Sequence, residues 1–296
     1  TKVLLYTEMY PVEQVLEAAQ RGEADLRALL AFDPVQQPLA VQLGGNDPAT
    51  MGQAAGICSR VGYEEVNINV GCPSGRVCEG GFGACLMAEP NLVQQLAAAV
   101  RAAVPPHVAV TVKHRLGVDN HDTWQELCEF VRTVAAPPAS VRHFIIHCRS
   151  AVLGKGLTTA WNRSVPPLRH EWAWALATVF PELSFELNGG VTSLDHVDTL
   201  LRPRLRIALP APLSTPGTTS PEPDIEQRRV NSKVLQDQQS VELRQSHVHV
   251  QSVMVGRAAF YSPWQILADA DRRIFGEPQS SLTRRRLLTQ YIEYAD

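Results

Sequence analysis

Residues 66–87 read VNINVGCPSGRVCEGGFGACLM, and the rest of the chain can be organised around this stretch. An apolar run ends at Asn69, and Cys72 follows between a glycine and a proline. Five glycines then fall within the thirteen residues 71–83. Because glycine has no Cβ, such a loop lets the backbone approach a flat or phosphorylated ligand. The stretch therefore predicts a ligand site at the end of a buried strand.

The composition is that of an ordinary soluble protein, with 296 residues of which 45% are hydrophobic and 19% charged. The net charge of −3 creates no general attraction for nucleic acid, although local basic patches remain open. We find no apolar run of membrane-spanning length and no signal peptide, so no membrane partner is expected. Six cysteines without a CxxC pair indicate free thiols in a reducing compartment, the cytoplasm or an organelle, and no metal site.

Strand-like runs alternate with helix-like runs along the chain. We expect strands at Val3–Tyr6, Leu39–Leu43, Glu65–Val70, Val108–Val112, His143–Ile146, Leu183–Leu187 and Val253–Val255. Helices are expected at about 23–30, 47–60, 89–104, 122–134, 168–180, 193–201 and from 263 onward. Repeated strand–helix units predict a parallel sheet, and short strands that are apolar on both faces are typical of a buried one.

The favoured fold class is α/β, a TIM (β/α)8 barrel whose first strand would precede Thr1. A doubly wound open sheet is the alternative, but no GxGxxG follows the first strand. Polar residues stand at the ends of nearly all the predicted strands, the face at which barrels carry their sites. These residues are Glu8, Gln42, Asn69, Lys113, His147, Asn188 and Arg257.

Two short glycine turns follow the last two predicted strands and open helices. They are Asn188-Gly189-Gly190 and Gly256-Arg257-Ala258. Barrels often bind a phosphate at this place on backbone N–H groups, and Arg257 would add a bidentate charge. The pair of turns therefore predicts a phosphate site.

Six segments together resemble the tRNA-dihydrouridine synthases, specifically the A-type subfamily. They read NINVGCPSGRVCEGGFGACLM, VTVKHRLGVDN, FIIHCRSAVLGKGL, NRSVPPLRHEW, LNGGVTSL and VMVGRA. The resemblance covers residues 2–201 and 252–296 in the same order. It implies a flavin-binding barrel over 1–275, then the start of a C-terminal helical tRNA-binding domain at 276–296. It also implies reduction of uridine to 5,6-dihydrouridine in the tRNA D-loop, as in the U20/U20a-type enzymes, with FMN and NADPH; we expect a monomer.

This reaction needs a hydride on carbon 6 of the uracil and a proton on carbon 5, and a reduced flavin supplies hydride. The resemblance makes Cys72 the proton donor, a role that suits a thiol because it is mostly protonated at neutral pH. Structural roles are expected for Cys58, Cys85, Cys128 and Cys148, whereas Cys78 is undecided.

The resemblance also assigns binding residues. Those expected at the flavin are Gln42, Lys113, His147, Asn188, Gly189, Gly190, Gly256 and Arg257. A cation at Lys113 would stabilise the reduced, anionic flavin ring. Those expected at the target uracil or the tRNA are Asn69, Arg115, Arg149, Lys155 and Arg163. Lys155 and Arg163 are also consistent with a solvated surface.

Residues 202–251 have no counterpart of that length in the family. Their first half is rich in proline and their second half in glutamine, arginine and valine. We expect a disordered insertion or translated non-coding sequence. Two other functions stay open, a flavin barrel that reduces a free pyrimidine and a non-catalytic RNA-binding remnant.

Overall fold

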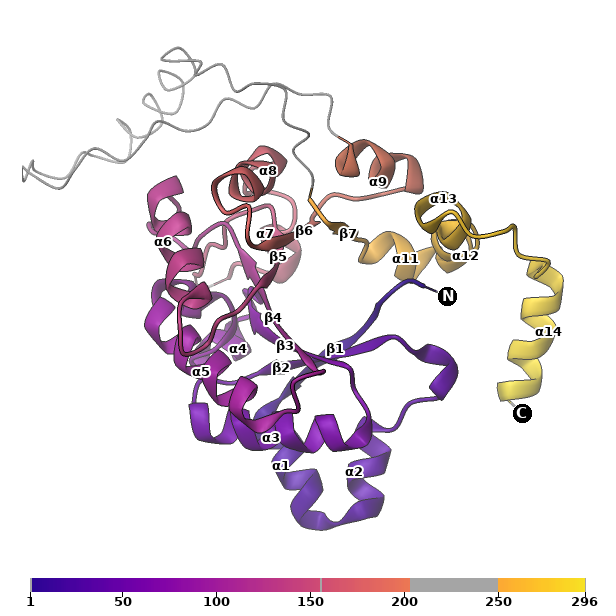
Figure 1. The fold of residues 1–296 in the computed structure, drawn as a ribbon, viewed down its shortest axis with the longest axis horizontal. Coiled ribbons are helices and arrows are strands. Elements are labelled where there is room, and N and C mark those ends of the chain that lie inside the picture. The colour runs from indigo at the N-terminus through magenta and orange to yellow at the C-terminus, as the bar shows by residue number, and fades with distance from the viewer. Residues whose placement is uncertain (1, 155, 203–249, 296) are drawn as a thin grey trace, which may run out of the picture.

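The computed structural model describes residues 2–154, 156–202 and 250–295 (Figure 1). Seven strands form one sheet in the order of the chain, and every neighbouring pair is parallel. The strands are β1 (Leu5–Pro11), β2 (Leu39–Gly44), β3 (Glu65–Val70), β4 (Ala109–Arg115), β5 (His143–His147), β6 (Ser184–Asn188) and β7 (Ser252–Met254). The predicted parallel α/β architecture is confirmed, and the sheet is curled (Figure 1).

Helices connect the strands and cover the outer side of the curled sheet (Figure 1). The longer ones are α1 (Val12–Arg21), α2 (Glu23–Leu30), α3 (Pro48–Val61), α5 (Pro90–Ala103), α6 (Trp124–Ala135), α8 (His170–Val179) and α9 (Leu194–Leu201). Shorter pieces are η1 (Pro34–Gln36), α4 (Gly75–Glu79), η2 (Gly83–Ala88), α7 (Thr159–Asn162), α11 (Arg257–Tyr261), α12 (Pro263–Leu267) and α13 (Ala270–Phe275). Helix α14 (Arg284–Ala295) ends the described chain and is exposed along its length.

Strand β3 shows how the sequence sets the two faces of the sheet. All six of its residues are buried, and apolar Val66, Ile68 and Val70 alternate with polar residues. Because side chains alternate along a strand, the polar residues share the opposite face. Buried polar groups require hydrogen-bond partners, so that face carries a column of polar contacts along the sheet.

The first strand differs from its prediction because it contains a bulge. The register with β2 shifts between Tyr6 and Met9, and the Gln42 N–H donates to the Thr7 hydroxyl (3.1 Å). The strand therefore continues past Thr7-Glu8 to Pro11, so Glu8 lies within it and not at its end. The helix α1 that follows was not predicted, although its buried Val15 and Ala18 fit a helical face.

Other boundaries are close to their predictions. The bounds of β3 and α2 are confirmed, and helix α6 is capped by Thr123 in a capping box with Glu126, one residue later than predicted. Helix α11 begins at the predicted turn Gly256-Arg257-Ala258, and the predicted break at Gly276–Ser280 lies between α13 and α14. The division of residues 263–275 into α12 and α13 was not predicted. Of the predicted insertion, residues 203–249 lie outside the described part of the chain.

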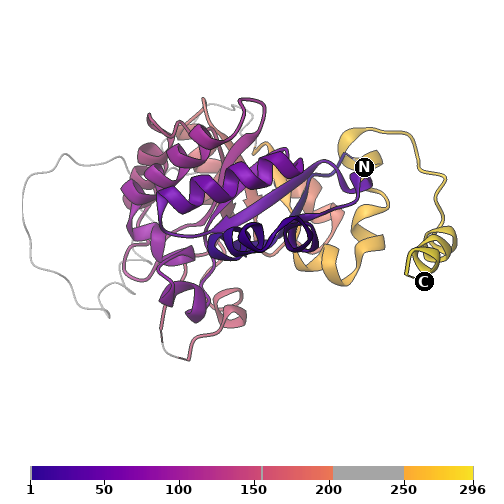
Figure 2. The same ribbon diagram turned by 90° about the horizontal axis from the view of Figure 1, so that it is seen from below.

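The N-terminal segment lies beside the C-terminal helices (Figures 1 and 2). Val3 packs against a small apolar cluster formed by Leu194, Ile266 and Ala270, and the Lys2 N–H donates to the Asp271 carboxylate (2.9 Å). The N-terminal segment is thus tied to α12 and α13. None of the helices in the described residues has the length and apolar character needed to cross a membrane.

Candidate active site

The Asn69 side chain holds the turn that carries Cys72 at the end of β3. Its Oδ1 accepts hydrogen bonds from the backbone N–H groups of Gly71 (3.1 Å) and Cys72 (2.9 Å). Its Nδ2 donates to Gln42 Oε1 (2.6 Å), and Gln42 Nε2 donates to Asn67 Oδ1 (2.7 Å). These hydrogen bonds fix the backbone position of Cys72. They also join the side chains of Gln42 and Asn69 directly.

The glycine-rich loop folds back onto Cys72. The Ala84 N–H donates to the Cys72 carbonyl (2.9 Å). Gly83 has φ +76°, and a Cβ there would stand 2.6 Å from the Cys72 carbonyl oxygen and 2.5 Å from Val77. The close approach that requires glycine at 83 is therefore to the backbone of Cys72 itself, whereas the sequence had suggested an approach to a ligand.

Arg115 links the Cys72 turn to two other loops. The side chain is 3% exposed, and its Nε donates to the Gly71 carbonyl (2.8 Å). Its Nη1 donates to the carbonyls of Ser150 (3.1 Å) and Asn162 (3.0 Å). Burial is the main cause of a lowered Arg115 pKa, to about 10, so the group still carries its charge at neutral pH. Arg115 was predicted to hold the target uracil; the structure places it as a brace beneath the site.

Lys113, His147 and Asn188 lie on the neighbouring strands β4, β5 and β6, where His147 is in register with Asn188 and Lys113 is in register with Ile145. Lys113 Nζ donates to Asn188 Oδ1 (3.2 Å), and Asn188 Nδ2 donates to the Met254 carbonyl (2.9 Å). Burial lowers the pKa of Lys113 to about 8. Burial, then the nearby cations Arg115, Lys113, Arg149 and Arg257, lower the pKa of His147 to about 2, so its ring is neutral. Lys113 thus supplies positive charge beside a neutral imidazole.

Two further arginines carry unused donors. Arg149 Nη1 donates to the carbonyls of Ser164 (3.4 Å) and Pro166. The Nε atoms of Arg149 and Arg163 are buried and have no hydrogen-bond partner among the described residues. Burial and the charge of Arg257 lower the pKa of Arg149. The positive charges of Arg149 and Arg257 therefore interact.

The glycine turn after β6 is built for close contact. Gly189 and Gly190 have φ values of +113° and +70°. A Cβ on Gly189 would meet the His147 ring at 2.8 Å, and one on Gly190 would meet Leu168 at 2.6 Å. Gly256 and Arg257 lie exposed after β7, and the electrostatic influence of Arg257 reaches His147 and Arg149. The two turns that were predicted to bind phosphate therefore follow the neighbouring strands β6 and β7.

Of the predicted residues that the structure describes, most lie in the C-terminal halves of β2 to β6 or in the loops that follow β5, β6 and β7, and Arg163 lies at the end of α7. Lys155 lies outside the described residues. Sequence reasoning missed Asn67 and Thr111, which are buried and hydrogen bonded, whereas Asn162, which had been assigned to the substrate loop, is also buried and hydrogen bonded. The signal for the first two was a polar residue inside an apolar strand. Among residues 2–154, 156–202 and 250–295, no group of three or more His, Cys, Asp or Glu side chains is arranged to hold a metal.

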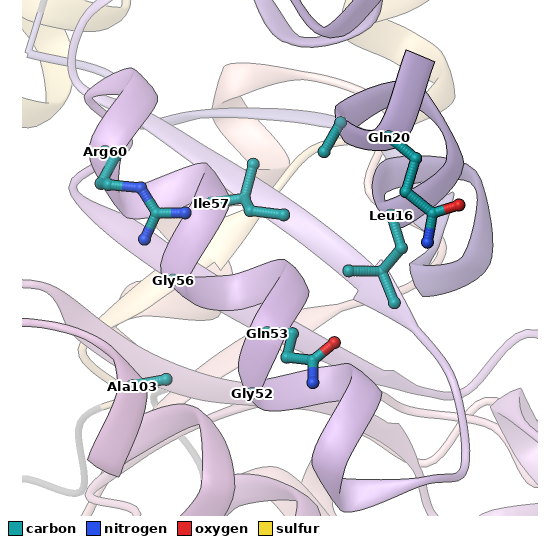
Figure 3. Close-up of a pocket in the computed structure, with 9 residues that line it drawn as sticks. Leu16, Gln20, Gly52, Gln53, Gly56, Ile57, Arg60 and Ala103 are labelled. Carbon is teal, nitrogen blue, oxygen red and sulfur yellow. The ribbon is translucent and has the colours of Figure 1, made fainter. Parts of the chain in front are cut away.

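A hollow of about 580 Å³ lies elsewhere, in the outer helical layer between α1, α3 and α5 (Figure 3). Leu16, Gln53, Ile57 and Arg60 are among the residues that line it. None of the predicted site residues does, so the hollow is separate from the strand ends.

Fold and site together define a parallel α/β protein that presents a thiol beside a cluster of cations at its strand ends. The sequence profile of the dihydrouridine synthase (Dus) family matches residues 1–203. A tRNA-dihydrouridine(20/20a) synthase of Synechocystis is 36% identical over 294 residues, covering 99% of this chain and 70% of that protein. The enzyme of the same name from Haemophilus ducreyi is 33% identical, covering 100% and 73%. The chain belongs to the dihydrouridine synthase family.

Two other likenesses differ in extent. The tRNA-dihydrouridine(20/20a) synthase of Xanthomonas axonopodis pv. citri is 47% identical over 191 residues, covering 64% of this chain and 54% of that protein. Among solved structures, a complex of 2-naphthoyl-CoA reductase aligns with a TM-score of 0.37 and 13% identity, covering 50% of this chain and 24% of that one. That likeness is too distant to carry an argument.

Proposed function

We propose that this protein is a tRNA-dihydrouridine synthase of the 20/20a type, a flavin-dependent oxidoreductase that reduces uridine to 5,6-dihydrouridine in the D-loop of tRNA. The observation that carries the proposal is the placing of Cys72. Asn69, Ala84 and Arg115 fix its turn from three sides, next to Lys113 and the Arg149–Arg163 loop. Family membership supplies the reaction, and this arrangement supplies the groups that the reaction needs.

The donor set fits FMN. A phosphate suits the positive-φ turn at Gly189-Gly190 together with Arg257, because backbone N–H groups and a guanidinium are the usual partners of such an anion. Lys113 would lie at the electron-rich edge of the flavin ring, with Gln42 and His147 as its polar neighbours. None of the described carboxylates forms an ion pair with Arg149, Arg163 or Arg257, so the positive charge is left for a ligand. NADPH is the proposed source of reducing equivalents.

When bound, the reduced flavin supplies the hydride for carbon 6 of the uracil. Cys72 donates its Sγ proton to carbon 5, and the Asn69 amide holds the turn from which it does so. The guanidinium groups of Arg149 and Arg163 are the proposed donors to the uracil carbonyls. The Cys72 turn contributes by holding the thiol in a fixed place, against which the uracil base is positioned.

At the level of the whole fold, we propose that the seven strands belong to a (β/α)8 barrel within residues 1–275. Their parallel order and the polar strand ends support this. Helix α14 would then start the helical domain that contacts tRNA at 276–296, and its three consecutive arginines, 284–286, suit a phosphate backbone. A monomer is the proposed state.

The proposal is tested by NADPH oxidation with the purified protein and FMN. We expect oxidation that depends on the protein and rises when unmodified tRNA is added. Stimulation by free uracil, uridine or orotate, without stimulation by tRNA, would instead indicate a reductase of free pyrimidines. Retained affinity for tRNA without any bound flavin would indicate an RNA-binding protein without catalysis.

A further inference from the structure

Gln42, Asn67 and Thr111 form a row of polar side chains across β2, β3 and β4. Gln42 is in register with Asn67, and Asn67 is in register with Thr111. Gln42 Nε2 donates to Asn67 Oδ1 (2.7 Å), and Asn67 Nδ2 donates to Thr111 Oγ1 (2.8 Å). Asn67 is fully buried and Thr111 is 2% exposed. On β3, Glu65 and Asn69 lie two residues before and after Asn67, so all three share one face of the strand.

The row is extended at both ends by residues of β3. Thr111 Oγ1 donates to Glu65 Oε1 (2.5 Å). At the other end, Asn69 Nδ2 donates to Gln42 Oε1 (2.6 Å), and Asn69 Oδ1 accepts from the Cys72 N–H (2.9 Å). An unbroken run of hydrogen bonds therefore leads from the Cys72 backbone to the Glu65 carboxylate. We call this run the hydrogen-bond series.

The direction of each bond in the hydrogen-bond series follows from its start. The Cys72 N–H can only donate, so Asn69 presents its oxygen there and its NH2 group to Gln42. The same requirement passes through the next two amides, and the Thr111 hydroxyl oxygen then accepts. The hydroxyl proton of Thr111 therefore needs an acceptor of its own, which the Glu65 carboxylate provides. Every group donates toward Glu65, and each link depends on the next.

We propose that Thr111 and Glu65 are positioning residues for Cys72 and act on it through the hydrogen-bond series. Hydrogen bonds in a series polarise and strengthen one another. Loss of the Thr111 hydroxyl leaves the preceding amide without its acceptor, so Gln42 and Asn69 hold the Cys72 turn less firmly. The effect on rate rests on the proposed function, in which Cys72 gives a proton to the uracil. The effect on the Cys72 backbone does not.

Tyr6 offers a matched control. Its hydroxyl donates to the same carboxylate oxygen, Glu65 Oε1 (3.0 Å), but it is not a link in the hydrogen-bond series. Tyr6→Phe and Thr111→Val each remove one hydroxyl donor from Glu65, whereas only Thr111→Val interrupts the series. Thr111→Ser keeps the hydroxyl and is the conservative variant that should restore the wild-type behaviour.

Hydrogen exchange at the N–H groups of Gly71 and Cys72 tests the coupling in the full chain, without flavin or tRNA. Both groups donate to Asn69 Oδ1, so their exchange reports how firmly that side chain holds the turn. Site-resolved mass spectrometry should show exchange about tenfold faster in Thr111→Val, with wild-type rates in Thr111→Ser and Tyr6→Phe. The amides of α6 serve as the internal reference. Equal acceleration in Tyr6→Phe, or none in Thr111→Val, would overturn the proposal.

The two half-reactions provide the second measurement. NADPH reduces bound FMN without the Cys72 thiol, whereas reoxidation by tRNA requires its proton. Thr111→Val should therefore slow reoxidation by saturating tRNA about tenfold and change the reduction by NADPH less than about twofold, and Thr111→Ser should restore the faster rate. Equal slowing of both steps, or of neither, would show that Thr111 does not position Cys72. If tRNA fails to reoxidise even the wild-type protein, the proposed function fails, and faster exchange in Thr111→Val would still support the coupling.

Discussion

The two ends of the sheet both carry buried polar groups, but with opposite charge. Toward the start of the strands, Glu65 and Glu186 are 8% and 7% exposed. Glu65 Oε1 accepts from the Tyr6 hydroxyl (3.0 Å) and Thr111 Oγ1 (2.5 Å), and Glu186 Oε2 accepts from Ser252 Oγ (2.9 Å). We call this set the carboxylate end. Where the strands finish, Lys113, Arg115, Arg149, Arg163 and Arg257 make up the cation end.

The groups at the two ends also differ in what they contact. At the carboxylate end each buried carboxylate has hydroxyl donors within the protein, and His143 Nε2 lies 3.5 Å from Glu186 Oε2, too poorly aligned for a hydrogen bond. At the cation end, Arg149 and Arg163 keep buried Nε donors without a partner among the described residues. In the described part of the chain, buried nitrogen atoms without a hydrogen-bond partner therefore occur at both ends, and the two ends differ in the sign of their charge.

The largest effect is expected from the loss of the Cys72 thiol. Cys72→Ala removes the proton donor, so dihydrouridine formation should fall by about 10²–10⁴-fold while flavin stays bound. Cys85→Ala, on the same loop, should keep most of the turnover. Normal turnover in Cys72→Ala, measured with saturating tRNA, would remove Cys72 from the reaction.

A smaller loss of rate is expected when the brace under the site is weakened. Arg115→Lys keeps the charge but cannot reach Gly71, Ser150 and Asn162 together. The Cys72 turn and the Asn162 loop should then separate, and kcat should fall on the order of a hundredfold with flavin still bound. Arg132→Lys, on the exposed face of α6, is the control. An unchanged kcat with a raised KM for tRNA would show that Arg115 binds substrate directly.

Binding of the flavin phosphate should depend on residues at the cation end and not on residues at the carboxylate end. Arg257→Ala should weaken FMN by about 2 kcal/mol, roughly 30-fold, while riboflavin affinity stays the same. Glu65→Gln, at the carboxylate end, should leave the affinity for both flavins unchanged. Titration of the apoprotein followed by flavin fluorescence measures both. Equal affinity of the wild-type protein for FMN and riboflavin would show that the cation end holds no phosphate.

Much of this organisation was predictable from sequence, and the exceptions have physical causes. The EVNINV pattern of β3 was sufficient to predict a buried strand, and the site at its end stays a prediction that rests on the position of Cys72. The sequence pattern did not reveal the bulge at Thr7-Glu8. The Gln42 N–H donates there to the Thr7 hydroxyl instead of to a backbone carbonyl. The bracing role of Arg115 was also hidden, because its partners are carbonyls of Gly71, Ser150 and Asn162, which lie far apart in the chain.

The smallest effect concerns pH and stability. His114 is fully buried between Phe130 and Phe144, its Nδ1 lies 2.6 Å from the Arg115 carbonyl, and burial lowers its pKa to about 4. The unfolded chain binds the proton near pH 6.5, so the stability that neutral His114 provides is lost as pH falls from 6.5 toward 4. From pH 7 to pH 5 the loss should be roughly 1.5–2 kcal/mol. Urea unfolding of His114→Asn, which does not titrate, should show that much less pH dependence; an equal dependence would contradict a neutral His114.

Mapping of the product tests most directly whether the protein reduces uridine in tRNA at the cation end. Unmodified tRNA is incubated with the protein, FMN and NADPH, and each uridine is then assayed for dihydrouridine by mass spectrometry of nuclease fragments. We predict dihydrouridine at positions 20 and 20a, with none above background for Cys72→Ala. Dihydrouridine at other positions only, or its absence from tRNA when free uridine is reduced, would contradict the account.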